Sequence, residues 1–234
     1  MNFDALVDEA WPSFESVHVG DWKVRFAGGV TKRANSAVRT GPAETGPGEL
    51  AEIERLYRER GMPVVFQLSD PGLDALLEER GYALADPTLL MTRDLASGPV
   101  EAPGEGLPIT ERPSPGWMDV WWSVDGRYAD QLPAAERILT GVAARYCGTG
   151  GVAVGRSVPQ DGMLGVYCMA VRPEARRRGL ARRVLRTLLA DGRRLGSSHA
   201  YLCVTEENAA ARDLYLGEGF EIVGGYRYRV LTSS

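Results

Sequence analysis

The sequence has few of the side chains on which many metal and nucleophilic sites depend. Its three cysteines (Cys147, Cys168 and Cys203) are too few, and odd in number, for a disulfide framework. Its two histidines, His18 and His199, are too few for most zinc sites and for a convincing catalytic triad. No metal site is therefore expected, and a reducing, cytoplasmic environment is the simplest one for this chain.

Long apolar segments and targeting signals are also missing. No window approaches the ~18 apolar residues of a membrane span, so no membrane contact is expected. The acidic start MNFDALVDEAW lacks the basic-then-apolar pattern of a signal peptide. No Gly-x-x-x-x-Gly-Lys loop is present, so the sequence gives no reason to expect ATP binding.

Charge is distributed unevenly along the 234 residues, whose net charge is −4. Residues 1–100 hold 16 acidic and 10 basic side chains, whereas residues 101–234 hold 15 and 17. The excess of acid argues against a nucleic-acid binder, although a local basic cluster can still hold an anion. Basic residues are concentrated between Arg172 and Arg194, where no aromatic side chain is present to stack on bases.

Two stretches rich in glycine and proline divide the chain. Residues 41–48 predict a loop, and residues 97–108 predict a linker between two domains. We therefore expect an N-terminal domain over residues 1–96 and a C-terminal domain over residues 109–234. Apolar periodicity predicts helices at 3–10, 50–60, 73–80, 179–195 and 209–216, and strands at 22–27, 63–68, 88–92, 151–158, 163–171, 200–204 and 226–231.

The two halves share part of their order of elements. A shift of 138 residues overlays Leu50–Arg60 on Leu188–Ser198, and Gly81-Tyr82 on Gly219-Phe220. One interpretation is a diverged internal duplication, and the other is two unrelated runs of helix, strand and helix.

The segment with the clearest chemistry follows the predicted strand 163–171. Pro173 ends the strand, Arg176-Arg-Arg-Gly179 forms a short basic turn, and an amphipathic helix begins. A loop that leads into a helix N-terminus presents unpaired N–H groups and the positive end of the helix dipole, which together favour phosphate. On the helix itself, Arg186, Arg193 and Arg194 are expected to form a solvated face opposite the apolar one.

These residues resemble the GCN5-related N-acetyltransferase (GNAT) superfamily. Arg176-Arg-Arg-Gly179-Leu-Ala181 is similar to that family's coenzyme A signature, Arg/Gln-x-x-Gly-x-Gly/Ala. The later strand Leu202-Cys-Val204, Asn208, and Leu214-Tyr215 followed by Gly219-Phe220 match its second motif in order and spacing. The resemblance implies an α/β GNAT fold, with a mixed, mostly antiparallel sheet flanked by helices, that uses acetyl-CoA.

The resemblance also implies a role for each matching residue. Met169, Ala170 and Val171 would pair with the pantetheine arm and polarise the acetyl carbonyl. Asn208 would contact the coenzyme arm, and Tyr215 would protonate the departing thiolate. The pyrophosphate would be held by Arg177, Arg178, Gly179, Leu180, Ala181 and Arg182.

Two of these residues also have a purely structural interpretation. Asn208 is a good N-cap for the helix that follows, and both roles can hold together. Tyr215 is either the acid or a core aromatic beside Leu214 and Phe220.

An alkylammonium must lose a proton before it attacks, at a cost of about 4–5 kcal/mol at pH 7. Where many relatives carry a carboxylate this chain has Tyr167, Cys168 and Cys203, so the general base is unassigned. One hypothesis is that Glu206 or Glu207 acts as the base through a water molecule.

The N-terminal half lacks the same chemistry. The shift of 138 residues places Gly41 opposite Gly179, Pro42 opposite Leu180 and Leu77 opposite Tyr215. Because proline has no N–H and leucine has no hydroxyl, this half resembles a partial, degenerate GNAT-like domain.

We therefore expect an acyltransferase that moves an acetyl group from acetyl-CoA to a primary amine by direct attack in a ternary complex. The alternative is a non-catalytic module that binds or senses acyl-CoA. The acceptor is expected to be a small-molecule or peptide amine, since the acidic N-terminal half mildly favours a cation. A monomer is expected, with a dimer as the alternative.

Overall fold

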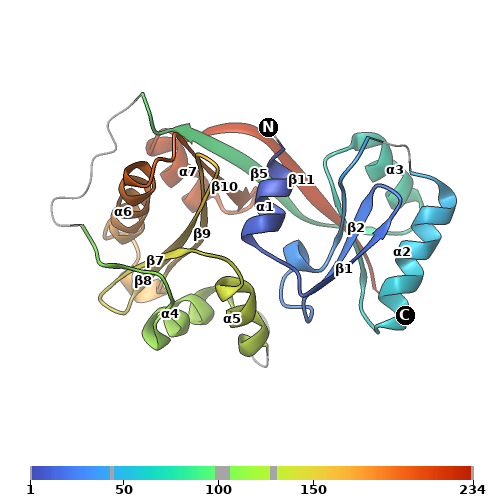
Figure 1. The fold of residues 1–234 in the computed structure, drawn as a ribbon, viewed down its shortest axis with the longest axis horizontal. Helices are drawn as coiled ribbons and strands as arrows, with labels where there is room; N and C mark the ends of the chain where they lie inside the picture. Colours follow the sequence, from blue (N-terminus) through green and yellow to red (C-terminus); the bar gives the residue numbers. More distant parts are fainter. Residues whose placement is uncertain (1, 43–44, 98–105, 127–130, 233–234) are drawn as a thin grey trace. The chain divides into compact units, whose positions relative to one another are not determined.

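The computed structural model describes residues 2–42, 45–97, 106–126 and 131–232 (Figure 1). By their contacts the residues group into two units. Unit 1 contains Met1–Thr88, Thr205–Glu207 and Gly225–Ser234, and unit 2 contains Leu89–Val204 and Asn208–Gly224. Each unit is described separately below.

The units do not follow the domain boundaries expected from the sequence. Strand β5 (Ala83–Asp94) begins in unit 1 and ends in unit 2, whereas β11 (Glu221–Leu231) begins in unit 2 and ends in unit 1. The physical reason is strand pairing, because Arg227–Leu231 pair with strand β4 (Val64–Leu68) of unit 1. Most of the expected linker, 97–108, lies outside the described residues.

Unit 1 is a mixed sheet with helices on it. Its strands lie in the order β1-β2-β3-β4-β11, and β3 and β4 are the parallel pair, with Ala37 opposite Phe66. The other neighbouring strands run antiparallel. The remaining elements are α1 (Phe3–Ala10), β1 (Glu15–Val19), β2 (Trp22–Phe26), the 3₁₀ helix η1 (Lys32–Ala34), β3 (Ala37–Arg39), α2 (Pro47–Glu59) and α3 (Pro71–Glu79).

Helices α2 and α3 cover the apolar face of this sheet. Helix α2 begins at Pro47, inside the predicted loop 41–48, because proline suits the first turn of a helix. Its buried stripe (Leu50, Ile53, Leu56 and Tyr57) packs on Trp22, Val24, Phe26, Val64 and Phe66. The predicted period of the helix is therefore confirmed, and its N-terminus lies earlier than expected.

Unit 2 has the same mixture of strand directions. Its strands lie in the order β5-β10-β9-β8-β7-β6; β9 and β10 run parallel, and β6 to β9 run antiparallel. The elements are β6 (Ile109–Thr110), α4 (Pro115–Asp125), α5 (Leu132–Thr140), β7 (Arg145–Thr149), β8 (Ala153–Gln160), β9 (Met163–Val171), the 3₁₀ helix η2 (Pro173–Ala175), α6 (Leu180–Arg194), β10 (His199–Thr205) and α7 (Ala209–Gly217).

Both faces of the unit 2 sheet are covered. Leu185 and Leu189 of α6, together with Tyr215 of α7, pack on Val166 and Leu202 of the central strands. Trp117 of α4 packs on Tyr146 of β7 with ring centroids 5.2 Å apart, and its indole N–H donates to the carbonyl of Cys147 (3.0 Å). The fold class expected from the sequence, an α/β mixed sheet flanked by helices, is confirmed.

Among the described residues, no helix combines the length and the apolar character that crossing a membrane requires.

Helix α3 is tied to the last strand by a buried ion pair. Asp74 Oδ1 accepts from Arg229 Nε (2.7 Å) and Asp74 Oδ2 accepts from Arg229 Nη2 (3.1 Å). Asp74 is 8 % and Arg229 4 % exposed. The hydrogen bonds from Arg229 lower the pKa of Asp74, so this pair stabilises the folded state above about pH 4 and is lost as the pH falls further.

Substitution of Asp74 by asparagine is predicted to destabilise the protein by about 2–3 kcal/mol at pH 7, because it removes the carboxylate that accepts from Nε and Nη2 of the buried Arg229 and leaves that charge paired with the exposed Glu78. The difference from the unsubstituted protein should shrink at pH 3. Urea unfolding at the two pH values tests this, with Glu79→Gln, an exposed carboxylate on the same helix, as the matched control. Equal losses in both variants would contradict the assignment.

Candidate active site

The two parallel strands of unit 2 stop pairing before they end. Their register runs from His199 opposite Met163 to Leu202 opposite Val166. Strand β9 continues to Val171 and β10 to Thr205. Beyond this point the side of β9 that faces β10 is open, so an extended ligand can pair with it as an added strand. Met169, Ala170 and Val171 lie on this stretch, as expected.

A bulge in β9 gives this stretch its shape. On the other side of β9 the pairing with β8 shifts, so that Val154 lies opposite Ala170 and Arg156 lies opposite Tyr167. Cys168, inside the bulge, has φ 54°, a left-handed value that is uncommon for a residue other than glycine. Bulges of this kind turn a strand and re-aim its backbone groups, often beside active sites.

The loop after β9 leads to an uncapped helix N-terminus. Arg177 has φ 61°, and Gly179, the N-cap residue of α6, has φ 74° and offers no side chain to cap the helix. The first intrahelical bond runs from Arg183 N–H to the Gly179 carbonyl (3.0 Å). The N–H groups of Leu180, Ala181 and Arg182 therefore remain available to an anion.

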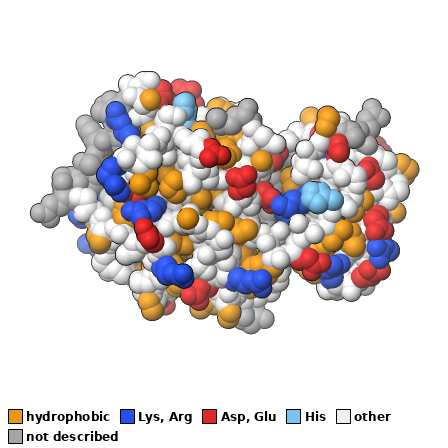
Figure 2. Space-filling model, viewed as in Figure 1, with side chains coloured by type: hydrophobic (Ala, Val, Ile, Leu, Met, Phe, Trp, Pro, Cys, Tyr) orange, Lys and Arg blue, Asp and Glu red, His pale blue; other side chains and the backbone are white. Residues whose placement is uncertain are grey.

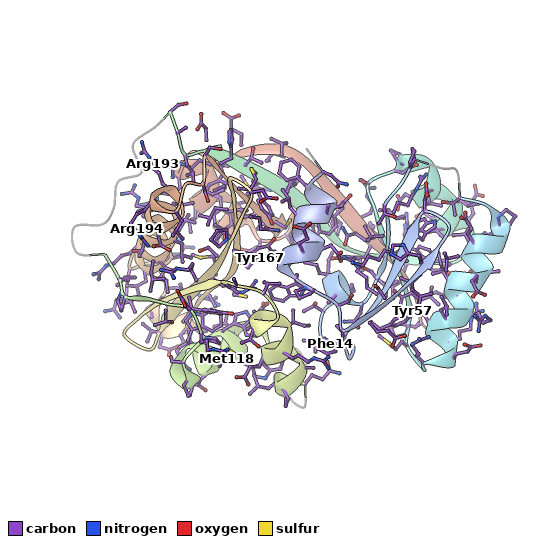
Figure 3. All side chains as sticks on the ribbon, viewed as in Figure 1. Phe14, Tyr57, Met118, Tyr167, Arg193 and Arg194 are labelled. Atoms are coloured by element: carbon purple, nitrogen blue, oxygen red, sulfur yellow. The ribbon has the colours of Figure 1, made fainter. Side chains whose placement is uncertain are left out.

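The surroundings of this helix end are basic. Figure 2 shows lysine and arginine side chains over the part of the molecule where Figure 1 draws α6. Arg177 and Arg178 are exposed, and no ion pair joins either of them to another described residue. At the other end of α6, Arg193 and Arg194 are also exposed (Figure 3), which confirms the predicted solvated face for these two.

The third predicted solvated residue, Arg186, is different, and the prediction for it is wrong. Its guanidinium donates from Nε to Oε2 (2.7 Å) and from Nη2 to Oε1 (3.1 Å) of Glu218. Arg182 Nε lies 2.7 Å from Oε1 of the same carboxylate, which is only 3 % exposed. The cause is helix α7, whose C-cap residue Glu218 pairs with this part of α6.

Helix α7 carries the two other predicted residues. The side chain of Asn208 caps the helix by accepting from Ala211 N–H (3.2 Å), which confirms its structural role and leaves its amide nitrogen as a donor. Tyr215 is 6 % exposed and packs edge-on against Phe220, with ring centroids 5.9 Å apart. Burial raises the pKa of Tyr215 well above its ordinary value, so its hydroxyl keeps its proton at neutral pH. Among the described residues nothing accepts that proton.

The structure does not assign the general base. Glu206 and Glu207 are exposed and group with unit 1. Tyr167 (Figure 3), which stands where many relatives carry a carboxylate, lies with its hydroxyl 2.8 Å from that of Tyr201, and Tyr201 donates to Gln160 Oε1 (2.6 Å). No group of three or more histidine, cysteine or acidic side chains in the described part of the chain is arranged to hold a metal ion.

Unit 1 has a different arrangement at the matching place. A pocket of about 260 Å³ lies at the ends of its parallel strands β3 and β4, with Arg39, Pro42, Gln67 and Asp70 in its lining. The helix that corresponds to α6 is α2, whose first residue, Pro47, has no N–H and whose Glu49 carboxylate accepts from Gly46 N–H (2.9 Å). Leu77, opposite Tyr215 in the shift of 138 residues, is buried. These features agree with a half that lacks the phosphate cradle of unit 2, that is, the free N–H groups of Leu180, Ala181 and Arg182 with Arg177 and Arg178 beside them. The descent of the two halves from a duplication stays a prediction.

Comparison with known proteins bears on the whole chain. A family model described as "Probable histone acetyltransferase Rv0428c C-terminal" matches residues 4–230. A protein of Bacillus subtilis (strain 168) described as "Uncharacterized N-acetyltransferase YobR" is 28 % identical over 239 residues, which cover 97 % of this chain and 96 % of the relative.

Solved structures show the same fold at low identity. A GCN5-related N-acetyltransferase from Kribbella flavida has a TM-score of 0.68 and 18 % identity, over 98 % of this chain and 94 % of that one. A tandem GNAT protein from the clavulanic acid biosynthesis pathway, solved without AcCoA, has a TM-score of 0.65 and 14 % identity, over 99 % and 87 %.

Gly155 of β8 lies where the pairing of β8 with the bulged strand β9 shifts, and its neighbours leave no room for a side chain. A Cβ atom at Gly155 would lie 2.6 Å from Met169 Sδ and 2.8 Å from Val184 Cγ1 of α6. We predict that Gly155→Ala lowers the free energy of unfolding by about 1–3 kcal/mol, since the added methyl overpacks this layer. Gly116→Ala on α4, where a Cβ meets nothing within 4 Å, is the control and should cause no loss in a thermal melt. An equal stability of the two variants would contradict the prediction.

Proposed function

The chain belongs to the GNAT superfamily of acetyltransferases, through the family whose model matches residues 4–230, and on this premise we propose that it transfers an acetyl group from acetyl-CoA to a primary amine. The transfer is a direct attack in a ternary complex. The acceptor is an amine on a small molecule or a peptide. The alternative, a non-catalytic acyl-CoA-binding module, is an outcome of the tests below.

The observation that carries this proposal is the uncapped N-terminus of α6. Its free N–H groups, the positive φ of Gly179 and the unpaired Arg177 and Arg178 suit the pyrophosphate of coenzyme A. A Cβ at Gly179 would meet nothing within 4 Å, so the space around the loop is open to a ligand. Met169, Ala170 and Val171 would hold the pantetheine arm along the open side of β9.

The proposed step needs little covalent chemistry from the protein. Acetyl-CoA supplies an activated thioester, whose acetyl carbon forms a bond to the amine nitrogen as its bond to sulfur breaks. An N–H of the Met169–Val171 backbone stabilises the negative charge that develops on the carbonyl oxygen. Tyr215 donates its phenolic proton to the departing sulfur. The proton that the amine must lose goes to a base or water that the residues named above do not include.

Arg178→Glu is predicted to weaken coenzyme binding, because it places a carboxylate beside the pyrophosphate. At 100 times Kd a ligand stabilises a fold by about 2.7 kcal/mol, which raises Tm by about 5 °C or more in a chain of this size. A thermal melt with acetyl-CoA should show this rise for the unsubstituted protein and little of it for Arg178→Glu.

Arg193→Glu makes the same change of charge at the other end of α6 and serves as the matched control. It should keep the rise in Tm. If both variants lose the rise in Tm, net charge explains the effect, and the assignment of the pyrophosphate to the N-terminus of α6 is wrong. If the unsubstituted protein shows none, the proposed use of acetyl-CoA fails.

Tyr215→Phe is predicted to lower kcat about 100-fold and to leave KM for acetyl-CoA within about twofold, because only the transition state needs the phenolic proton. Since burial raises the pKa of Tyr215, its ionisation should cause no fall of kcat between about pH 6 and 9. Initial rates with a panel of primary amines test both points. An unchanged kcat would remove Tyr215 from the mechanism, and binding without turnover of any amine would favour the non-catalytic module.

A further inference from the structure

Glu218 is a buried carboxylate that none of the roles assigned above uses. It lies at the C-terminal end of α7, and its side chain is 3 % exposed. Burial of a carboxylate costs several kcal/mol unless charged partners and hydrogen bonds offset it. Here Arg182 and Arg186, one turn apart on α6, together make three contacts of 2.7–3.1 Å with its two oxygens. An apolar contact at this place would also hold α6 and α7 together. The chain instead has a directional contact between charged groups.

The backbone of Glu218 connects this contact to the predicted acid. Its N–H donates to the carbonyls of Leu214 (3.0 Å) and Tyr215 (3.1 Å), and the N–H of Phe220 donates to the Tyr215 carbonyl (3.0 Å). Tyr215 is thus held in the turn that Glu218 closes. The apolar packing between α6 and α7 is non-directional and tolerates small shifts of one helix along the other. A carboxylate bound by two guanidinium groups does not tolerate such shifts.

Arg182 connects the same contact to the proposed phosphate site. It lies in the first turn of α6, so its backbone N–H is one of the free donors, while its side chain pairs with Glu218. One residue therefore contributes to the cradle through its backbone and to the position of α7 through its side chain.

We propose that Glu218 is a positioning residue for the transfer, which fixes the Tyr215 hydroxyl relative to the N-terminus of α6 through Arg182 and Arg186. This inference rests on the proposed function. Because the pairing is between groups on α6 and α7, both in unit 2, it needs nothing from unit 1.

A double-mutant cycle tests it, with the unsubstituted protein, Glu218→Gln, Tyr215→Phe and the double variant. Glu218→Gln should lower kcat about tenfold, as a displacement of a catalytic group does, with KM for acetyl-CoA changed less than about threefold. In the Tyr215→Phe background the same substitution should change kcat by less than about twofold, because its effect passes through the missing hydroxyl. An equal fall in both backgrounds would show a merely structural role and overturn the proposal.

A second measurement does not depend on turnover. With ¹³C-labelled tyrosine, the ring signal that disappears in Tyr215→Phe identifies Tyr215 among the nine tyrosines. Glu218→Gln should move this signal, and Glu221→Gln, an exposed carboxylate in the same unit, should not. An unmoved signal would overturn the proposal. If the unsubstituted protein turns over no amine, the proposed function fails while the spectrum still decides the placement of Tyr215.

If Glu218→Gln does not fold, Arg186→Gln replaces it in both measurements. That variant removes two of the contacts and leaves Arg182 to hold the carboxylate. It should lower kcat by a smaller factor, again without further loss in the Tyr215→Phe background, and should move the Tyr215 signal in the same direction. An unmoved signal, or an equal fall of kcat in both backgrounds, would overturn the proposal.

Discussion

The parallel pairing of β9 and β10 is the constraint on which the arrangement of unit 2 depends. Parallel neighbours need a crossover connection, and here the crossover is helix α6. Its N-terminus must therefore follow the end of β9. Because the pairing stops at Leu202 opposite Val166, the open side of β9 and the free N–H groups of α6 lie on one continuous stretch of chain. A ligand with an extended arm and a phosphate group fits such a stretch.

The same topology in unit 1 supports a different local chemistry. Strands β3 and β4 are parallel and α2 joins them, yet Pro42 in the intervening loop and Pro47 at the start of α2 have no N–H. The carboxylate of Glu49, in the first turn of α2, accepts from Gly46 N–H (2.9 Å). Topology alone therefore does not make a phosphate site. Free N–H groups in a first turn that holds no carboxylate, together with the arginines before it, distinguish α6 of unit 2.

Strong periodicity and short motifs made much of this predictable from the sequence. The alternation of apolar and basic residues with the helical period predicts a helix at 179–195, and α6 spans Leu180–Arg194. Strand β3 is not predictable in this way, because its three residues, Ala37–Arg39, are too few to show a period. The sequence does not reveal the role of Glu218 either. Its partner Arg186 is 32 residues away in the sequence, and a glutamate between two glycines has the pattern of an exposed turn. The sequence allows Tyr215 to be either the acid or a core aromatic, and its burial against Phe220 is compatible with both roles.

Hydrogen–deuterium exchange of the full chain, with and without acetyl-CoA, tests the central claim most directly. Amides that bind a ligand exchange more slowly. The account predicts slower exchange in peptides that cover Met169–Val171 and Leu180–Arg182, and little change around Pro42 and Asp70 in unit 1. Protection confined to unit 1, or none in either unit, would contradict the assignment of the coenzyme to the N-terminus of α6.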